Sequence, residues 1–166
     1  MAGGKKLFKF GRMVVLLTGK HAGKKAVIIK VMNEGTKDRQ FPHLLVAGIA
    51  RYPKKVSKKM TQEKIAKRIR IKPFVKYVNM NHVMPTRYLV KPDLDLSSVL
   101  AQYETKSQTK KENTIKVRDP LNNPEIKLGL KKKVKMILEK KYRELDLNSV
   151  EENDLKIKFF FKPLRF

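Results

Sequence analysis

Cysteine is absent from this chain of 166 residues. Without thiols the protein has no disulfide, no thiolate zinc site and no cysteine nucleophile. Long apolar runs are absent too, because lysine or arginine interrupts each one before it reaches the length of a membrane-spanning helix. The first ten residues lack the apolar segment of a signal peptide, and Ala2 stands where myristoylation requires glycine. We therefore expect a soluble, intracellular protein with no membrane partner.

Acidic residues are scarce. The 15 Asp and Glu residues are outnumbered by 40 Lys and Arg residues, which gives a net charge of +25. The imbalance is concentrated in residues 1–90, which carry +19, whereas residues 91–166 carry +6. Such self-repulsion opposes a compact state unless a polyanion neutralises it. Nucleic acid is the leading expected partner; an acidic membrane and a heparin-like polymer are the alternatives.

Patterns that carry catalysis or hold a cofactor are missing. The three histidines, His21, His43 and His82, lie in separate parts of the sequence, and no pair has the spacing of metal ligands. Residues 1–90 contain only three carboxylates, which form no evident pair. No glycine pattern of a nucleotide-binding loop occurs. The sequence thus predicts no enzyme, no metal site, no cofactor and no small-molecule substrate.

Two short apolar runs, residues 13–17 and 26–31, flank a basic turn at residues 18–25. Runs of this length, rich in Val, Ile and Leu and joined by a glycine-containing connection, predict a β-hairpin. Gly19 and Gly23 supply the backbone freedom of the turn. The predicted tip carries Lys20, His21, Lys24 and Lys25. Positive charge and free backbone N–H groups suit a phosphate backbone, although an ordinary hairpin with a solvated basic turn fits equally well.

The predicted strands lie near residues 13–18, 26–32, 43–51, 73–80 and 87–91, with a turn at 81–86 before the last. Five short strands without alternating helices indicate a small barrel, which closes its own edges. Gly48 lies inside the third strand and indicates a bulge or a close backbone approach.

Between the third and fourth strands, residues 54–59 are almost entirely charged. Residues 61–70 predict a short basic helix with Thr61 as N-cap and with Ile65 and Ile69 on one face. A solvated loop is the usual role of such a charge run. The basic helix that follows favours a surface that contacts phosphate.

Beyond residue 91 the composition changes, which predicts an extension at 92–166 after a barrel at 1–91. A short helix is expected at 93–103, a polar loop at 104–113 and an acidic loop at 145–154. Asn123 and Pro124 predict the start of a longer amphipathic helix, whose lysines either face phosphate or remain solvated. The phenylalanines of residues 156–166 are too apolar for a free tail. The protein's own core, an RNA crevice or a neighbouring protein should bury them.

The hairpin resembles the KOW motif of ribosomal and transcription-elongation proteins. Three further motifs are more specific: VAGIxRYP at residues 46–53, NHxMPTRY at 81–88 and the closing LRF at 164–166. Together they resemble the eukaryote-type ribosomal protein L twenty-seven family of the large subunit. The resemblance implies a KOW-type SH3-like barrel with a helical extension on ribosomal RNA, and neither catalysis nor a cofactor. Polar segments near 97–113 and 145–155 look inserted, and the family implies no role for them.

The leading hypothesis is a structural component of the large (60S) ribosomal subunit that binds ribosomal RNA and participates in translation. It would contact neighbouring ribosomal proteins through its extension, in the cytoplasmic ribosome after assembly in the nucleus and nucleolus. A KOW module that binds a polymerase, and a basic protein of membrane or polyanion surfaces, are the alternatives. The candidate RNA-binding residues are Lys20, His21, Lys24, Lys25, Arg51, Lys54, Lys55, Lys58, Lys59, Lys64, Lys67, Arg68, Arg70, Lys72, Arg87, Lys131, Lys132, Lys133 and Arg165.

Overall fold

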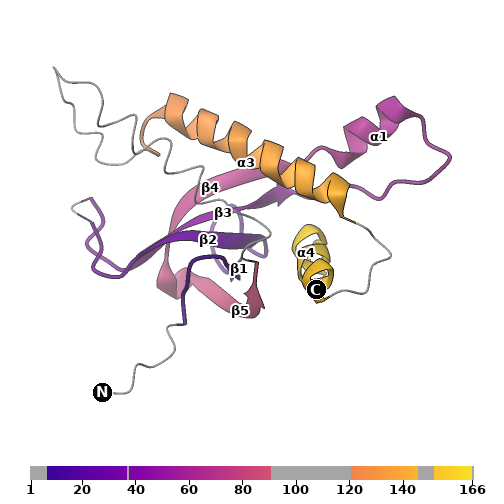
Figure 1. The fold of residues 1–166 in the computed structure, drawn as a ribbon. Coiled ribbons are helices and arrows are strands. Elements are labelled where there is room, and N and C mark those ends of the chain that lie inside the picture. The colour runs from indigo at the N-terminus through magenta and orange to yellow at the C-terminus, as the bar shows by residue number, and fades with distance from the viewer. Residues whose placement is uncertain (1–6, 37, 91–120, 146–151, 166) are drawn as a thin grey trace.

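The computed structural model describes residues 7–36, 38–90, 121–145 and 152–165. Its elements are β1 (Arg12–Leu16), β2 (Lys25–Met32), β3 (His43–Arg51), α1 (Gln62–Ile69), β4 (Lys72–Asn79), the 3-10 helix η1 (Met80–His82), β5 (Val83–Leu89), α3 (Pro124–Glu144) and α4 (Glu152–Phe161). Five strands form one antiparallel sheet in the order β4-β3-β2-β1-β5, and α3 and α4 lie beside it (Figure 1). The predicted class, mainly β with a helical extension, is confirmed. The helix and loop predicted at 93–103 and 104–113 lie outside the described residues.

The sheet is open at both sides. In its strand order β4 and β5 are the outer strands, and among the described strands no pairing joins them to close the predicted barrel. The predicted turn at 81–86 is wrong in its second half, because β5 begins at Val83 and pairs with β1 from Leu16↔Val83 onward. Only η1 turns the chain, and Asn79 stabilises it by accepting a hydrogen bond from the Asn81 N–H at 2.9 Å. Pro85 is tolerated in β5 because an edge strand needs no second ladder partner.

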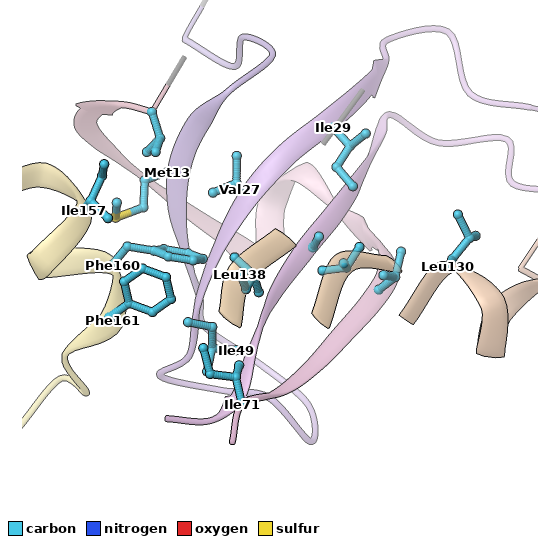
Figure 2. Close-up of a cluster of buried hydrophobic side chains, with 14 of the residues drawn as sticks. Met13, Val27, Ile29, Ile49, Ile71, Leu130, Leu138, Ile157, Phe160 and Phe161 are labelled. Carbon is cyan, nitrogen blue, oxygen red and sulfur yellow. The ribbon is translucent and has the colours of Figure 1, made fainter. Parts of the chain in front are cut away.

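Both faces of the sheet are buried, which explains why the strands read as unbroken apolar runs. On β2, Ala26 and Ile28 belong to one cluster of buried side chains, while Val27 and Ile29 belong to the other. In the cluster that contains Ala26 and Ile28, all the buried side chains come from the strands. The second includes residues of α3 and α4, and Figure 2 shows the helical side chains pointing at the sheet. A strand covered on one side only would alternate apolar with polar residues.

Helix α3 docks through three buried residues spaced four apart, Leu130, Val134 and Leu138. Burial of each such side chain stabilises the fold by roughly 1.5–3 kcal/mol. The predicted helix start is confirmed, since the Asn123 side chain accepts a hydrogen bond from the Glu125 N–H at 3.0 Å. A polar contact adds to the docking: the Ile71 N–H donates to Glu139 Oε1 at 3.1 Å. Helix α3 therefore packs on the sheet of the same chain. This packing is independent of whether its exposed lysines contact phosphate or solvent.

Helix α4 resolves the question of the aromatic tail. Ile157, Phe160 and Phe161 are buried in the cluster beneath α3 and α4 (Figure 2). Of the three predicted ways to bury the phenylalanines, the protein's own core is confirmed for these side chains. The acidic loop predicted at 145–154 is wrong at its end, because α4 already begins at Glu152. No helix in the described parts of the chain is long and apolar enough to cross a membrane.

Candidate nucleic-acid interface

The turn between β1 and β2 is a compact basic loop. Gly19 and Gly23 have positive φ angles of 79° and 70°, so the predicted need for glycine is confirmed. Three N–H groups of the loop donate within the hairpin: Ala22 to Gly19 O, Gly23 to Leu16 O and Lys24 to His21 O, at 2.7–3.1 Å. They are not available to phosphate, which corrects part of the predicted anion site. Lys20 is exposed at the tip, so the tip offers positive charge to a phosphate.

His21 is held against the sheet. Its ring stacks on Phe74, with centroids 4.0 Å apart and an interplanar angle of 5°. The space for Phe74 comes from Gly48, where a Cβ atom would lie 2.5 Å from Phe74 Cζ and 2.5 Å from Lys25 O. The predicted close approach at Gly48 is thus confirmed. Because His21 is fixed by this stacking, it is a positioned group and not a freely moving surface histidine.

A small pocket of about 230 Å³ opens beside His21. We call it the hairpin pocket, and its polar and aromatic walls come from His21, Phe41, Lys76, Tyr77, Asn79 and His82. The hairpin, the loop before β3, the end of β4 and η1 each contribute. Except for His21, none of these residues is among the candidate RNA-binding residues predicted from the sequence. Since the contributing residues lie far apart in the chain, only the fold brings them together.

Positive charge surrounds this pocket. Burial lowers the pKa of His21, and the charges of Lys76, Lys20, Lys131 and Lys24 lower it further. Among the described residues, no carboxylate lines the pocket. Lys131 lies on α3, so the tip of the hairpin and the first half of that helix contribute to one electropositive region. An anion placed there would be attracted by several cations at once.

The predicted position of Lys25 is wrong. Lys25 is the first residue of β2 and is fully buried. Its ammonium donates to the carbonyls of Phe159 and Lys162, the latter at 2.6 Å, and lies 3.6 Å from the centre of the Phe159 ring. Burial and the charge of Lys162 lower its pKa to about 8. Lys25 therefore holds the end of α4 and is not part of an exposed RNA-binding surface.

The basic arm, residues 54–70, projects from the sheet between β3 and β4 and carries α1 (Figure 1). No residue of α1 is buried. Two hydrogen bonds close the arm: the Lys54 N–H donates to Arg68 O at 2.9 Å, and Arg68 Nε donates to Lys55 O at 3.0 Å. Thr61 precedes the helix as predicted, but its side chain makes no capping bond. The arm carries eight cations and one carboxylate. It is therefore a charged projection whose helix is not buried against the core of the protein.

The other candidate residues lie outside the arm and the tip. At the base of the arm, Arg51 and Lys72 are exposed and are register partners on β3 and β4. Lys132 is exposed and Lys131 and Lys133 are half-buried on α3, Arg87 lies on β5 over the Tyr88 ring, and Arg165 is exposed after α4. The candidate cations thus occupy several regions of the molecule rather than one patch.

Within the described residues, no three His, Asp or Glu side chains are grouped as metal ligands. On α3, Glu139 and Glu144 lie near lysines of the same helix, at 3.7 Å from Lys135 and 3.9 Å from Lys140. Such contacts between neighbouring turns at the surface of a helix contribute little energy. Neither of these arrangements provides a catalytic pair.

Comparison with known proteins agrees with this geometry. The model of the Ribosomal L27e protein family matches residues 13–166. A curated relative, "Large ribosomal subunit protein eL27" of Tetrahymena thermophila, is 47% identical over 161 residues, which cover 97% of this chain and 99% of that protein. A match of this extent spans the sheet, the arm and both C-terminal helices. The chain therefore belongs to the Ribosomal L27e family, a family of structural ribosomal proteins and not of enzymes.

Proposed function

We propose that this chain is a structural component of the large ribosomal subunit that binds and stabilises ribosomal RNA and thereby participates in translation. The basic arm carries this proposal, because it places eight cations and one carboxylate on a projection with no buried helical residue. Such a surface contacts the phosphate backbone and positions the protein, with little reading of base sequence. The site of action is the cytoplasmic ribosome, reached after assembly in the nucleus and nucleolus.

The rest of the proposed RNA surface consists of the tip of the hairpin, three consecutive lysines of α3 (Lys131, Lys132 and Lys133), and Arg51, Lys72, Arg87 and Arg165. The division of the chain into a unit of strands at residues 1–91 and an extension at 92–166 is part of the same proposal. Neighbouring ribosomal proteins would meet the extension, where Leu128, Met136 and Leu155 expose 54%, 71% and 50% of their area. Exposed side chains of this kind suit a protein contact more than a phosphate backbone. The buried Phe160 and Phe161 remove the reason for proposing a membrane surface.

Salt dependence of RNA binding tests the proposal. The purified full-length chain should bind large-subunit ribosomal RNA with an affinity that falls steeply as salt rises, with a slope of about −0.9 per neutralised phosphate. Replacement of an exposed arm lysine, Lys58→Glu, should weaken binding and make the slope shallower by about 1. Lys140→Glu is the matched control, since Lys140 is an exposed lysine on α3 that the proposed surface does not include. A flat salt response, or equal effects of both variants, would contradict this assignment.

A further inference from the structure

The hairpin pocket combines two kinds of wall. Some of its lining residues are cationic or hydrogen-bonding, among them Lys76, His21 and Asn79. Others are aromatic and include Phe41. Groups of the first kind recognise a phosphate or the polar edge of a base, and an aromatic face stacks on a base. The combination is typical of a site for a nucleotide that has left its helix.

Phe41 is exposed yet held in place. It exposes 42% of its area although it lies in a loop. The buried His43 fixes that loop, because its Nδ1 donates to the Phe41 carbonyl at 2.8 Å. The His43 ring also meets the Phe41 ring edge-on at 5.8 Å and the Tyr77 ring at 5.5 Å. An aromatic surface that is ordered before binding costs less entropy when a base stacks on it.

The charge around the pocket is positive, and its described lining residues include no carboxylate that would neutralise it. Lys76, Lys20, Lys131 and Lys24 all act on His21 strongly enough to lower its pKa, after the effect of burial. A phosphate beside His21 would reverse this effect, because a negative charge favours the imidazolium. The pocket is thus electrostatically suited to one phosphate group.

The size of the pocket restricts the ligand. Its volume of about 230 Å³ suits one base or one phosphate and is too small for a duplex. Two larger pockets in the described residues fit less well. One, along α3, is lined by Glu139 and Glu144 as well as Lys140 and Arg143, so its charges balance and it includes no aromatic ring among its described lining residues. The other lies between β5 and α4 and has Tyr88 as the single aromatic residue among its described lining residues.

We propose that the hairpin pocket receives a single unpaired RNA nucleotide, with its phosphate near Lys76 and His21 and its base against Phe41. This inference rests on the proposed RNA-binding function and deepens it. The basic arm then supplies affinity for any RNA backbone, and the pocket supplies a preference for RNA with a bulged or unstacked base. The preference is for structure and not for base identity, because every base has an aromatic face.

The test compares two RNA probes with the full-length chain: a perfect 20-base-pair duplex and the same duplex with one bulged 2-aminopurine. We expect the wild type to bind the bulged duplex at least about fivefold more tightly, the lower end of what one stacked base contributes. Fluorescence of the bulged base should change on binding. Phe41→Leu should bring the ratio of the two affinities close to one, because it removes the ring but keeps the backbone carbonyl that His43 contacts.

Lys76→Gln is the second variant and should also reduce the ratio, since Lys76 is an exposed residue of β4 whose loss does not disturb the core. Lys58→Gln is the matched control for loss of charge. It should weaken binding of both duplexes by the same factor and leave their ratio unchanged. If the wild type binds both duplexes equally, or if Phe41→Leu keeps the preference, the pocket proposal is overturned and general RNA binding stands. If neither duplex binds, the proposed function itself fails.

Discussion

Lys25 offers the sharpest test of how the C-terminal helix is held. Its ammonium donates to the carbonyls of Phe159 and Lys162 at the end of α4. In a continuing helix the Phe159 carbonyl would accept from the N–H four residues later, but residue 163 is proline and has no N–H. Lys25 therefore supplies a hydrogen bond that the helix cannot make for itself. The perturbation is Lys25→Met, alone and combined with Pro163→Ala.

The loss of stability caused by Lys25→Met can be estimated from the two carbonyls that it leaves without a donor. A buried carbonyl that loses its partner costs about 1–3 kcal/mol. The second carbonyl belongs to Lys162, whose side chain is exposed, so water replaces part of that bond. Removal of a buried positive charge offsets some of the loss. We expect Lys25→Met to lower the free energy of unfolding by about 1–3 kcal/mol at pH 7.

The double mutant, Lys25→Met with Pro163→Ala, tests whether the missing hydrogen bond to the Phe159 carbonyl causes the loss of stability. In the Pro163→Ala background the N–H of residue 163 becomes available to the Phe159 carbonyl, so the cost of Lys25→Met should fall by about 1 kcal/mol, the net contribution of one hydrogen bond. Urea denaturation followed by circular dichroism gives the four free energies of the cycle. Lys20→Met is the control, because Lys20 is an exposed lysine of the same hairpin. An equal cost of Lys25→Met in both backgrounds would refute the reasoning about the Phe159 carbonyl.

Two further predictions concern the same core. Burial lowers the pKa of Lys25 from 10.5 to about 8, so between these values the unfolded chain binds more protons than the folded one. The wild type should thus gain stability relative to Lys25→Met as pH rises from about 8 to 10.5, and lose this gain as pH falls back from 10.5 to about 8, by at most about 1.4 kcal/mol per pH unit in urea titrations. Gly48→Ala should destabilise by about 1–3 kcal/mol, because its Cβ would lie 2.5 Å from the Lys25 carbonyl. The helical glycine variant Gly129→Ala should instead be neutral or stabilising by up to about 1 kcal/mol, and equal midpoints for the two glycine variants would argue against the packing explanation.

Local patterns predicted most of the elements. The strands at 13–18, 26–32, 43–51 and 73–80 agree with β1 to β4 to within two residues, because each apolar run is bounded by polar residues or proline. The start of α3 was predictable because Asn123 and Pro124 act within a few residues of each other. The error at β5 came from reading Pro85 as part of a turn. An edge strand accepts proline, and no local signal shows which strand will be at the edge.

The aromatic tail was harder to predict because its pattern has little helical periodicity. Phe160 and Phe161 are adjacent, and both are buried because α3 covers one part of α4 and the sheet covers another. A helix buried on more than one side shows no clear apolar stripe. The sequence therefore indicated that the phenylalanines required burial, but not which surface would bury them.

Lys25 and the hairpin pocket were not predictable from neighbouring residues, for opposite reasons. Lys25 stands next to the exposed tip in sequence, yet its environment is decided by Phe159, 134 positions later. The pocket takes its walls from the hairpin, the loop before β3 and the end of β4, none of which carries a binding motif alone. One signal for Lys25 was nevertheless present: a proline four residues after Phe159 leaves a carbonyl that needs a donor from elsewhere. In a chain with 40 lysines and arginines, a cation is a frequent candidate for that donor. Charge in such a protein therefore has two uses, since most cations of the described residues are not buried, while Lys25 is enclosed and completes the fold.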